Sequence, residues 1–250
     1  SGAEIFNIMA FDDSFNPAAL ATQPYDFVPL DLRLGLTKPL RSKENEGKVL
    51  NWGIVGAGRV CHDFVQALKV VPGAVVYGVA ARDKSRAENF CKTHNIKHVY
   101  HTYEELCSVK EIDIIYIGTV QSEHLKHSML ALNNNKHVIV EKPAGLNASE
   151  VEEMVRVARS KKRFFMEGMW TRFFPVVEIA RRVIFELNEI GEVEALMSDF
   201  GFNSFENEKY PESPMYDPKL GGGALFYVGC YPLATIPFAF KLQSSDMPDR

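Results

Sequence analysis

A glutamate and a lysine stand directly after an apolar run in the middle of the chain. Residues 138–140 lead into Glu141, Lys142 and Pro143. In an open parallel sheet, ligands bind beyond the carboxyl ends of the strands. A lysine placed there can donate a proton to, or accept one from, an oxygen on a carbon that exchanges hydride, and Glu141 can hold or polarise it. The alternative is a solvated lysine that ends a strand before a turn proline.

A glycine turn follows an earlier apolar run. Residues 49–55 are followed by Gly56, Ala57 and Gly58. Gly56 and Gly58 match the first two glycines of the G-x-G-x-x-G fingerprint. Those glycines allow a tight turn and bring a pyrophosphate to the amino end of the next helix. The third position is Cys61, a small residue that still permits close helix packing. The spacing predicts a dinucleotide site, and a plain glycine turn is the alternative.

Two arginines follow the next apolar run. Arg82 comes directly after Ala81, and Arg86 follows four residues later. The guanidinium fork suits phosphate oxygens, so the pair favours NADP over NAD. Asp83 could instead cap the following helix, and two solvated surface arginines are the alternative interpretation.

The elements that would position these residues alternate between strand and helix. We predict strands over 49–55, 74–80, 98–100, 112–117, 137–140 and 164–167, with helices over 59–70, 84–94, 103–109, 123–134 and 148–161. This order is typical of an α/β, Rossmann-type doubly wound parallel sheet. We therefore assign residues 49–167 to a dinucleotide-binding Rossmann domain.

The pattern changes after Gly168. We predict a helix over 175–187, an alternating strand over 193–202, a polar loop over 203–220 and an apolar helix from near Gly222. One long strand cannot bury its face alone. We therefore interpret 168–250 as the start of an α+β substrate and dimerisation domain that is incomplete in this chain.

Composition narrows the class of protein. A net charge of −4 and a pI near 6.0 give no electrostatic footprint for nucleic acid. We find no run of about 20 apolar residues, and we expect no membrane span. The four cysteines are scattered, which favours a reducing, cytoplasmic compartment. Residues 1–48 are rich in proline and aspartate, and we expect a partly disordered extension or a docking arm.

Several of these motifs together resemble the glucose-fructose oxidoreductase and inositol dehydrogenase superfamily. They are the turn at 56–58, the pair Ala81 and Arg82, the Glu-Lys-Pro box at 141–143 and the run EGMWTRFFP at 167–175. The resemblance covers roughly 49–240. It implies an NADP-dependent oxidoreductase that moves hydride between nicotinamide and a carbinol carbon of a cyclic trans-dihydrodiol or an aldose such as D-xylose. It also implies a homodimer, if the second domain is complete.

The resemblance implies roles for particular residues. Lys142 would lie beside the nicotinamide, and Tyr231, which follows the glycines at 221–223, would be the proton-transfer group; a tyrosine facing a core is the alternative. The expected cofactor-binding residues are Gly56, Gly58, Arg59, Val60, Arg82, Arg86, Thr119, His124, Glu141 and Lys142, and the expected substrate residues are Trp170, Arg172 and Phe200.

The two histidines on the predicted helix 123–134 are less specific. Similar histidines in the superfamily approach the nicotinamide, but from residue type we expect His124 and His127 to be surface helix histidines. Neither has a carboxylate or cysteine at metal-binding spacing, so we assign no metal.

The chain departs from the family at one position of the expected site. An aspartate usually stands four residues before the catalytic tyrosine, and this chain has Tyr227 there. A tyrosine does not supply a negative charge at neutral pH. The rival hypothesis is therefore a non-catalytic or regulatory relative that binds a dinucleotide without a completed substrate domain.

Overall fold

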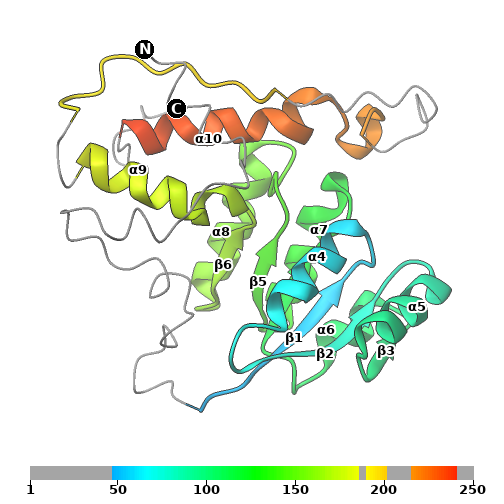
Figure 1. Cartoon of the computed structure of the whole chain (residues 1–250). Helices are drawn as coiled ribbons and strands as arrows, with labels where there is room; N and C mark the ends of the chain where they lie inside the picture. Colours follow the sequence, from blue (N-terminus) through cyan, green and yellow to red (C-terminus); the bar gives the residue numbers. More distant parts are fainter. Residues whose placement is uncertain (1–46, 186–189, 202–214, 241–250) are drawn as a thin grey trace. The chain divides into compact units, whose positions relative to one another are not determined.

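The protein is described by a computed structural model covering residues 47–185, 190–201 and 215–240, which belong to one compact unit distinct from residues 1–46. Its centre is a six-stranded parallel sheet with the strand order β3-β2-β1-β4-β5-β6 (Figure 1). The strands are β1 (Leu50–Val55), β2 (Ala74–Ala80), β3 (His98–Tyr100), β4 (Ile114–Ile117), β5 (His137–Val140) and β6 (Phe165–Glu167). The prediction of a doubly wound Rossmann sheet is confirmed.

Helices cover both faces of the sheet. They are α4 (Arg59–Leu68), α5 (Lys84–His94), α6 (Tyr103–Ser108), α7 (His124–Asn133) and α8 (Ala148–Ser160), followed by α9 (Pro175–Phe185) and α10 (Cys230–Ala239). Shorter turns are η3 (Gln121–Glu123), η4 (Trp170–Phe173) and η6 (Pro218–Leu220), and η7 (Leu225–Gly229) is π-helical. The predicted helices of the Rossmann domain agree with the structure to within about two residues at their ends.

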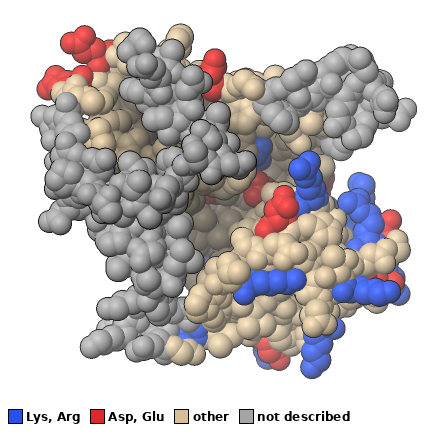
Figure 2. Space-filling view, viewed as in Figure 1, with Lys and Arg blue, Asp and Glu red and all other residues tan. Residues whose placement is uncertain are grey.

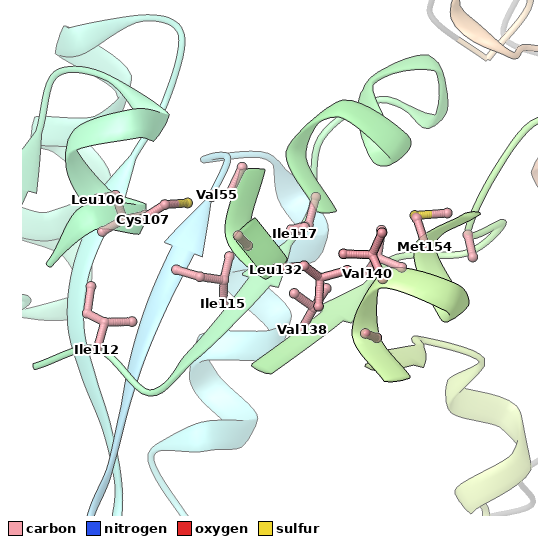
Figure 3. Close-up of a cluster of buried hydrophobic side chains, with 14 of the residues drawn as sticks. Val55, Leu106, Cys107, Ile112, Ile115, Ile117, Leu132, Val138, Val140 and Met154 are labelled. Carbon is pink, nitrogen blue, oxygen red and sulfur yellow. The ribbon is translucent and has the colours of Figure 1, made fainter. Parts of the chain in front are cut away.

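Two apolar layers hold the helices to the sheet because successive strand side chains point to opposite faces. Ile115 and Ile117 of β4 pack with α6, α7 and α8, as in Figure 3, where Leu132 and Met154 also lie in this cluster. Ile114 and Tyr116 pack on the other face, in a cluster with residues of α4 and α5. Burial on both faces explains why these strands are almost wholly apolar.

Strand register brings the carboxyl ends of the strands to one level. Val55 pairs with Ala80 on one side and with Ile117 on the other. Ile117 pairs with Val140, which in turn pairs with Glu167. The residues that follow these strands therefore share one edge of the sheet, and they include the glycine turn, Arg82 and the Glu-Lys-Pro box.

Helix caps support the local structure around this edge. Asp83 caps α5 by accepting from the backbone N–H groups of Ser85 and Arg86, and Asn147 caps α8 by accepting from Glu150. Thr102 and Glu105 form a reciprocal capping box on α6. The cap role weighed for Asp83 is thus confirmed.

The strand predicted over 193–202 is wrong for the described residues 193–201, which have no regular secondary structure. In the described part of the chain no neighbouring strand pairs with them, so alternation of apolar and polar residues could not by itself make a strand. The apolar helix expected from near Gly222 is present as η7 and α10. Most of the polar loop, residues 203–214, and the last two residues of the helix over 175–187 lie outside the described residues.

Among the described residues, the segment Pro218–Ala239 is, by its length and composition alone, long and apolar enough to cross a membrane. It is not one regular helix, because Gly221 and Gly223 have positive φ angles of 80° and 115°. Prolines 232 and 237 interrupt the hydrogen bonding of α10 as well. Figure 2 shows the whole chain from the same side as Figure 1, and on this side Lys and Arg side chains project from several places, with Asp and Glu side chains among them.

Candidate functional site

The glycine turn packs tightly against the end of β4. Gly56 has a φ angle of +109°, and a Cβ at this position would lie 2.8 Å from the carbonyl oxygen of Gly118. Cys61, at the third position of the fingerprint, is fully buried, and its thiol lies 3.6 Å from the same carbonyl oxygen. Burial raises the pKa of the Cys61 thiol to about 12. Cys61 therefore serves as a small packing residue beneath the turn, as the sequence predicts.

The turn opens onto the amino end of α4. Gly58 is the N-cap residue, gives no side-chain cap, and is followed by no acidic residue in the first helical turn. The first N–H groups of a helix need partners from outside the helix, and an anion can supply them. Arg59 and Val60 begin the helix and are both exposed. This end of α4 is suited to a phosphate.

A cleft of about 830 Å³ lies along this edge of the sheet. Its lining joins the ends of three strands with η6, and comprises Gly56, Ala57, Gly58, Ala81, Arg82, Asp83, Arg86, Tyr103, Gly118, Thr119, Val120, Glu123, Lys126, His127 and Leu220. The volume of this cleft is large enough for a dinucleotide. The predicted Gly56, Gly58, Arg82, Arg86 and Thr119 all line it, whereas Tyr103, Lys126 and Leu220 had no motif to mark them.

The two arginines occupy different places on the rim. Arg82 is exposed, and Arg86 donates from Nη2 to the carbonyl oxygen of Ala57 at 3.2 Å. Asp83 accepts from Ser85, and these hydrogen bonds hold the pKa of Asp83 below its ordinary value. The carboxylate at this strand end is therefore engaged in capping α5, while Arg82 remains available to the cleft.

The expectation of surface histidines on α7 is wrong for both residues. His124 is 1% exposed, with Nδ1 2.8 Å from the carbonyl oxygen of Pro143 and Nε2 3.1 Å from that of Thr119. His127 is 3% exposed, and its Nδ1 lies 3.1 Å from the hydroxyl of Thr119. Both side chains face inward because this face of α7 packs against the loops after β4 and β5. Burial lowers the pKa of each ring.

His124 consequently ties two of the site-forming loops together, whereas His127 lines the cleft. A three-residue helical spacing showed only that the two rings share a face. It did not show whether that face is inside or outside.

Glu141 is held by a tyrosine of the neighbouring strand. The hydroxyl of Tyr116 donates to Oε1 of Glu141 at 2.7 Å, and the backbone N–H of Lys142 donates to Oε2 at 3.3 Å. Burial raises the pKa of the Glu141 carboxyl. Glu141 thus anchors the end of β5 and contacts the backbone of Lys142. The ammonium of Lys142 donates its hydrogen bond to another residue, Tyr227.

The ammonium of Lys142 reaches the last described helices. Its Nζ donates to the backbone carbonyl oxygen of Tyr227 at 2.7 Å. The same Nζ lies 5.0 Å from the ring centroid of Tyr227 and 4.8 Å from that of Tyr231. The structure therefore brings together Lys142 and Tyr231, the two residues predicted to handle the proton.

Two aromatic side chains surround Tyr231. Nε1 of Trp170 donates to its hydroxyl at 2.7 Å, and the ring of Phe200 stacks on its ring with a centroid distance of 4.9 Å and an interplanar angle of 19°. Trp170 is 58% exposed and Phe200 is 41% exposed. These are the predicted walls of a substrate pocket. Arg172 is exposed on η4, and no described contact joins it to Lys142 or Tyr231.

Metal chemistry has no visible basis in the described part of the chain, where no group of three or more His, Cys, Asp or Glu side chains could hold an ion. The polar groups that meet around Tyr231 are one ammonium, one phenol and an indole N–H. Groups of these kinds can move a proton and orient an oxygen.

Residues 50–169 match the model of an oxidoreductase family with an NAD-binding Rossmann fold. The chain is 41% identical over 199 residues to trans-1,2-dihydrobenzene-1,2-diol dehydrogenase of Bos taurus, covering 79% of this chain and 58% of that protein. It is 38% identical over 192 residues to the protein of the same name from Xenopus tropicalis, covering 76% of this chain and 56% of the relative. The chain thus spans little more than half the length of these relatives.

A solved structure of a 3-ketoreductase from Actinomadura kijaniata, in complex with NADP and TDP-benzene, superposes with a TM-score of 0.66 at 22% identity, over 77% of this chain and 57% of that one. This likeness concerns the fold. Together with the glycine turn and the cleft, the matches show a Rossmann domain of the kind that binds a nicotinamide dinucleotide. Residues 50–169 are thus similar to an oxidoreductase family with an NAD-binding Rossmann fold, in agreement with the predicted resemblance to the glucose-fructose oxidoreductase and inositol dehydrogenase superfamily.

Proposed function

We propose that the protein is an NADP-dependent oxidoreductase acting on a carbinol carbon of a cyclic trans-dihydrodiol or of an aldose such as D-xylose. The observation that carries the proposal is the convergence of Lys142 and Tyr231 at the end of β5, on the sheet edge that also carries the dinucleotide cleft. The names of the relatives at about 40% identity support the substrate class. A cytoplasmic homodimer is part of the proposal, on the grounds of cysteine use and family resemblance.

The residues of the cleft fit a dinucleotide. Gly56 leaves no room for a side chain beside Gly118, and the uncapped amino end of α4 offers N–H groups to a pyrophosphate. Arg82 and Arg86 on the rim support a 2′-phosphate and so favour NADP. When bound, the nicotinamide supplies the hydride acceptor or donor.

Tyr231 is the proposed proton-transfer group. Its hydroxyl oxygen accepts a hydrogen bond from Trp170, so its own proton stays available for exchange with a substrate oxygen. In oxidation, Tyr231 would act as the phenolate and take the carbinol proton as the C–H hydride leaves for a bound nicotinamide. In reduction, the phenol O–H would give that proton to the carbonyl oxygen of the substrate. Lys142 provides a positive charge near Tyr231, with Nζ 4.8 Å from the ring centroid, and such a charge favours the phenolate that forms when the phenol gives up its proton.

The aromatic side chains support a ring-shaped or apolar substrate. Trp170 and Phe200 flank Tyr231 and are both partly exposed, so that a substrate seated on them can reach the phenol. Flat rings cover the faces of cyclic diols and of sugars through apolar contact.

Steady-state kinetics with NADP and either a trans-dihydrodiol or D-xylose test the proposal. We expect turnover in the wild-type protein and a fall in kcat of about 100-fold or more in Lys142→Met and in Tyr231→Phe, the usual effect of removing a proton-transfer group. NADPH affinity should change little in Tyr231→Phe. Unchanged activity in both variants would show that the assigned roles are wrong.

A second candidate function is a dinucleotide-binding relative without catalysis. Tyr227 favours it, because it stands where the family resemblance expects an aspartate. Tight NADPH binding without turnover of any diol, polyol or sugar supports this alternative, and robust turnover eliminates it.

A further inference from the structure

Tyr227 forms two contacts with the ammonium of Lys142. The carbonyl oxygen accepts its hydrogen bond at 2.7 Å, and the ring centroid lies 5.0 Å from Nζ. The ring of Tyr231 lies at a similar distance on the same nitrogen, 4.8 Å. A cation within about 6 Å of a ring centroid is attracted by the negative face of the ring. The ammonium is therefore surrounded by two aromatic rings and a carbonyl dipole.

The local helix geometry makes this arrangement possible. Tyr227 lies within η7, the π-helical turn Leu225–Gly229, and Tyr231 lies in the first turn of α10. In π-helical register a carbonyl accepts from the N–H five residues later. For Tyr227 that residue is Pro232, which has no N–H. The carbonyl of Tyr227 thus lacks the partner that this register would provide and accepts from Lys142 instead.

Glu141 and Glu167 are acidic groups at this edge of the sheet, and both accept hydrogen bonds from other groups. Glu141 accepts from Tyr116, and Glu167 accepts from the backbone N–H of Ala144 at 2.9 Å. In the described residues, the direct contacts of the Lys142 ammonium are thus with carbonyl oxygen and aromatic faces rather than with a carboxylate.

We infer that Tyr227 is a positioning residue that holds Lys142 as a cation against Tyr231 through its ring and its backbone carbonyl, in place of an acidic side chain. This inference rests on the proposed function for its catalytic meaning. The contact itself is formed by residues of this chain alone. A carboxylate at position 227 is therefore not needed to hold the Lys142 ammonium, because the ring and the backbone carbonyl of Tyr227 supply negative electrostatic potential at Nζ.

The test compares variants that keep or remove the ring. Tyr227→Phe retains the ring and the backbone carbonyl, whereas Tyr227→Leu retains only the carbonyl. Amine acetylation consumes the neutral form, so the full-length protein without cofactor is labelled with trace isotopic acetic anhydride and the extent at Lys142 is read by peptide mass spectrometry. The exposed Lys84 on α5 is the internal reference.

We expect Lys142 in Tyr227→Phe to react as in the wild type, and Lys142 in Tyr227→Leu to react about threefold to tenfold faster relative to Lys84, the range that loss of one cation–π contact gives. Equal labelling in all three proteins would overturn the inference. Faster labelling in Tyr227→Phe and Tyr227→Leu alike would also overturn it, because the hydroxyl rather than the ring would then be responsible.

A second measurement uses the wild-type protein, so it remains possible even if Tyr227→Leu does not fold. Reductive ¹³C-methylation of the wild-type lysines gives methyl resonances, and the Lys142 signal is assigned by its loss in Lys142→Arg. Methyl groups close to two aromatic faces resonate upfield of the remaining lysine signals, and we expect this for Lys142. A Lys142 signal at the position of exposed lysines would contradict the inference.

Turnover adds a third readout once the proposed function is established. Tyr227→Phe should keep kcat, and Tyr227→Leu should lower kcat with little change in the KM for NADP. Because the labelling and the NMR measurements use no cofactor or substrate, they judge the role of Tyr227 even if no turnover is found. Failure of the proposed function and failure of this inference are therefore separate results.

Discussion

The indole Nε1 of Trp170 donates a hydrogen bond to the hydroxyl of Tyr231 at 2.7 Å. This contact links η4, just beyond the last strand of the Rossmann sheet, to α10, whose first turn carries the phenol. It also leaves the hydroxyl oxygen with a fixed donor, so the direction in which the tyrosine can give or take a proton is set by the tryptophan.

Replacing Trp170 tests the importance of this contact. Trp170→Phe keeps an aromatic ring packed edge-on to Phe174 but removes the N–H donor. We expect kcat for the proposed reaction to fall about 10-fold, the effect of losing one hydrogen bond of roughly 1.4 kcal/mol in the transition state. The matched control is Phe173→Leu on the same turn, 67% exposed, which should leave kcat unchanged. If both variants behave alike, the indole N–H has no part in the chemistry.

Gly56 and Gly58 should respond differently to an added methyl group. A Cβ at Gly56 would lie 2.8 Å from a backbone oxygen and sits on a φ of +109°, whereas a Cβ at Gly58 would meet nothing nearer than 3.9 Å. We expect Gly56→Ala to lower the free energy of unfolding by about 1–3 kcal/mol. Gly58→Ala should leave stability nearly unchanged while weakening NADPH binding, because its methyl occupies the phosphate approach.

Chemical denaturation and fluorescence titration with NADPH measure these two effects. Gly201→Ala, with open space around its Cβ position, is the stability control. Equal stability of Gly56→Ala and Gly201→Ala would mean that the close approach to Gly118 carries no energetic weight.

Arg82 should decide the choice between the two dinucleotides. Its exposed guanidinium on the cleft rim is free of the backbone contact that engages Arg86 with Ala57. We expect Arg82→Ala to lower the NADPH-to-NADH affinity ratio about 10-fold or more, since one charge-assisted hydrogen bond accounts for that factor. Arg86→Ala should weaken both cofactors, because it also loosens the turn.

Isothermal titration with NADPH and NADH reads this ratio directly. Arg156→Ala on α8, far along the chain and 4.0 Å from Glu153, provides the charge-matched control. An unchanged ratio in Arg82→Ala would assign cofactor choice to other residues.

Stability should fall as the pH is lowered below the ordinary histidine range. Burial lowers the pKa of His124 and of His127 from the usual value of 6.5, so below that pH the unfolded chain binds more protons than the folded protein. The free energy of unfolding therefore decreases with falling pH, by up to about 1.4 kcal/mol per pH unit for each such ring. The raised pKa of Glu141 acts in the opposite sense, above the ordinary value of 4.5.

Urea unfolding at pH 7.5 and pH 5.5 measures this dependence. The difference between the two pH values should shrink in His124→Asn and stay as in the wild type in His101→Asn, whose side chain is exposed. A difference between the two pH values as large in His124→Asn as in the wild type would show that the lowered pKa of His124 does not contribute to the stability.

Much of the Rossmann domain was determined by local sequence. The apolar runs became strands because their residues are buried on both faces, and the glycine turn was visible because a close backbone approach to Gly118 excludes a side chain at Gly56. The cap formed by Asp83 acts on neighbours a few residues away, so its chemistry could be predicted as well.

Tertiary structure alone decided the state of several residues whose types were known in advance. The strand predicted over 193–202 failed for its described residues because pairing needs a neighbour that alternation cannot supply. His124 and His127 were expected at the surface and are buried, because only packing determines which face of a helix turns inward. Most of all, Lys142 meets the carbonyl of Tyr227 across 85 residues of sequence. Spacing along the chain shows which groups could react, but the distance between an ammonium and two tyrosine rings depends on how the helices fold back onto the sheet.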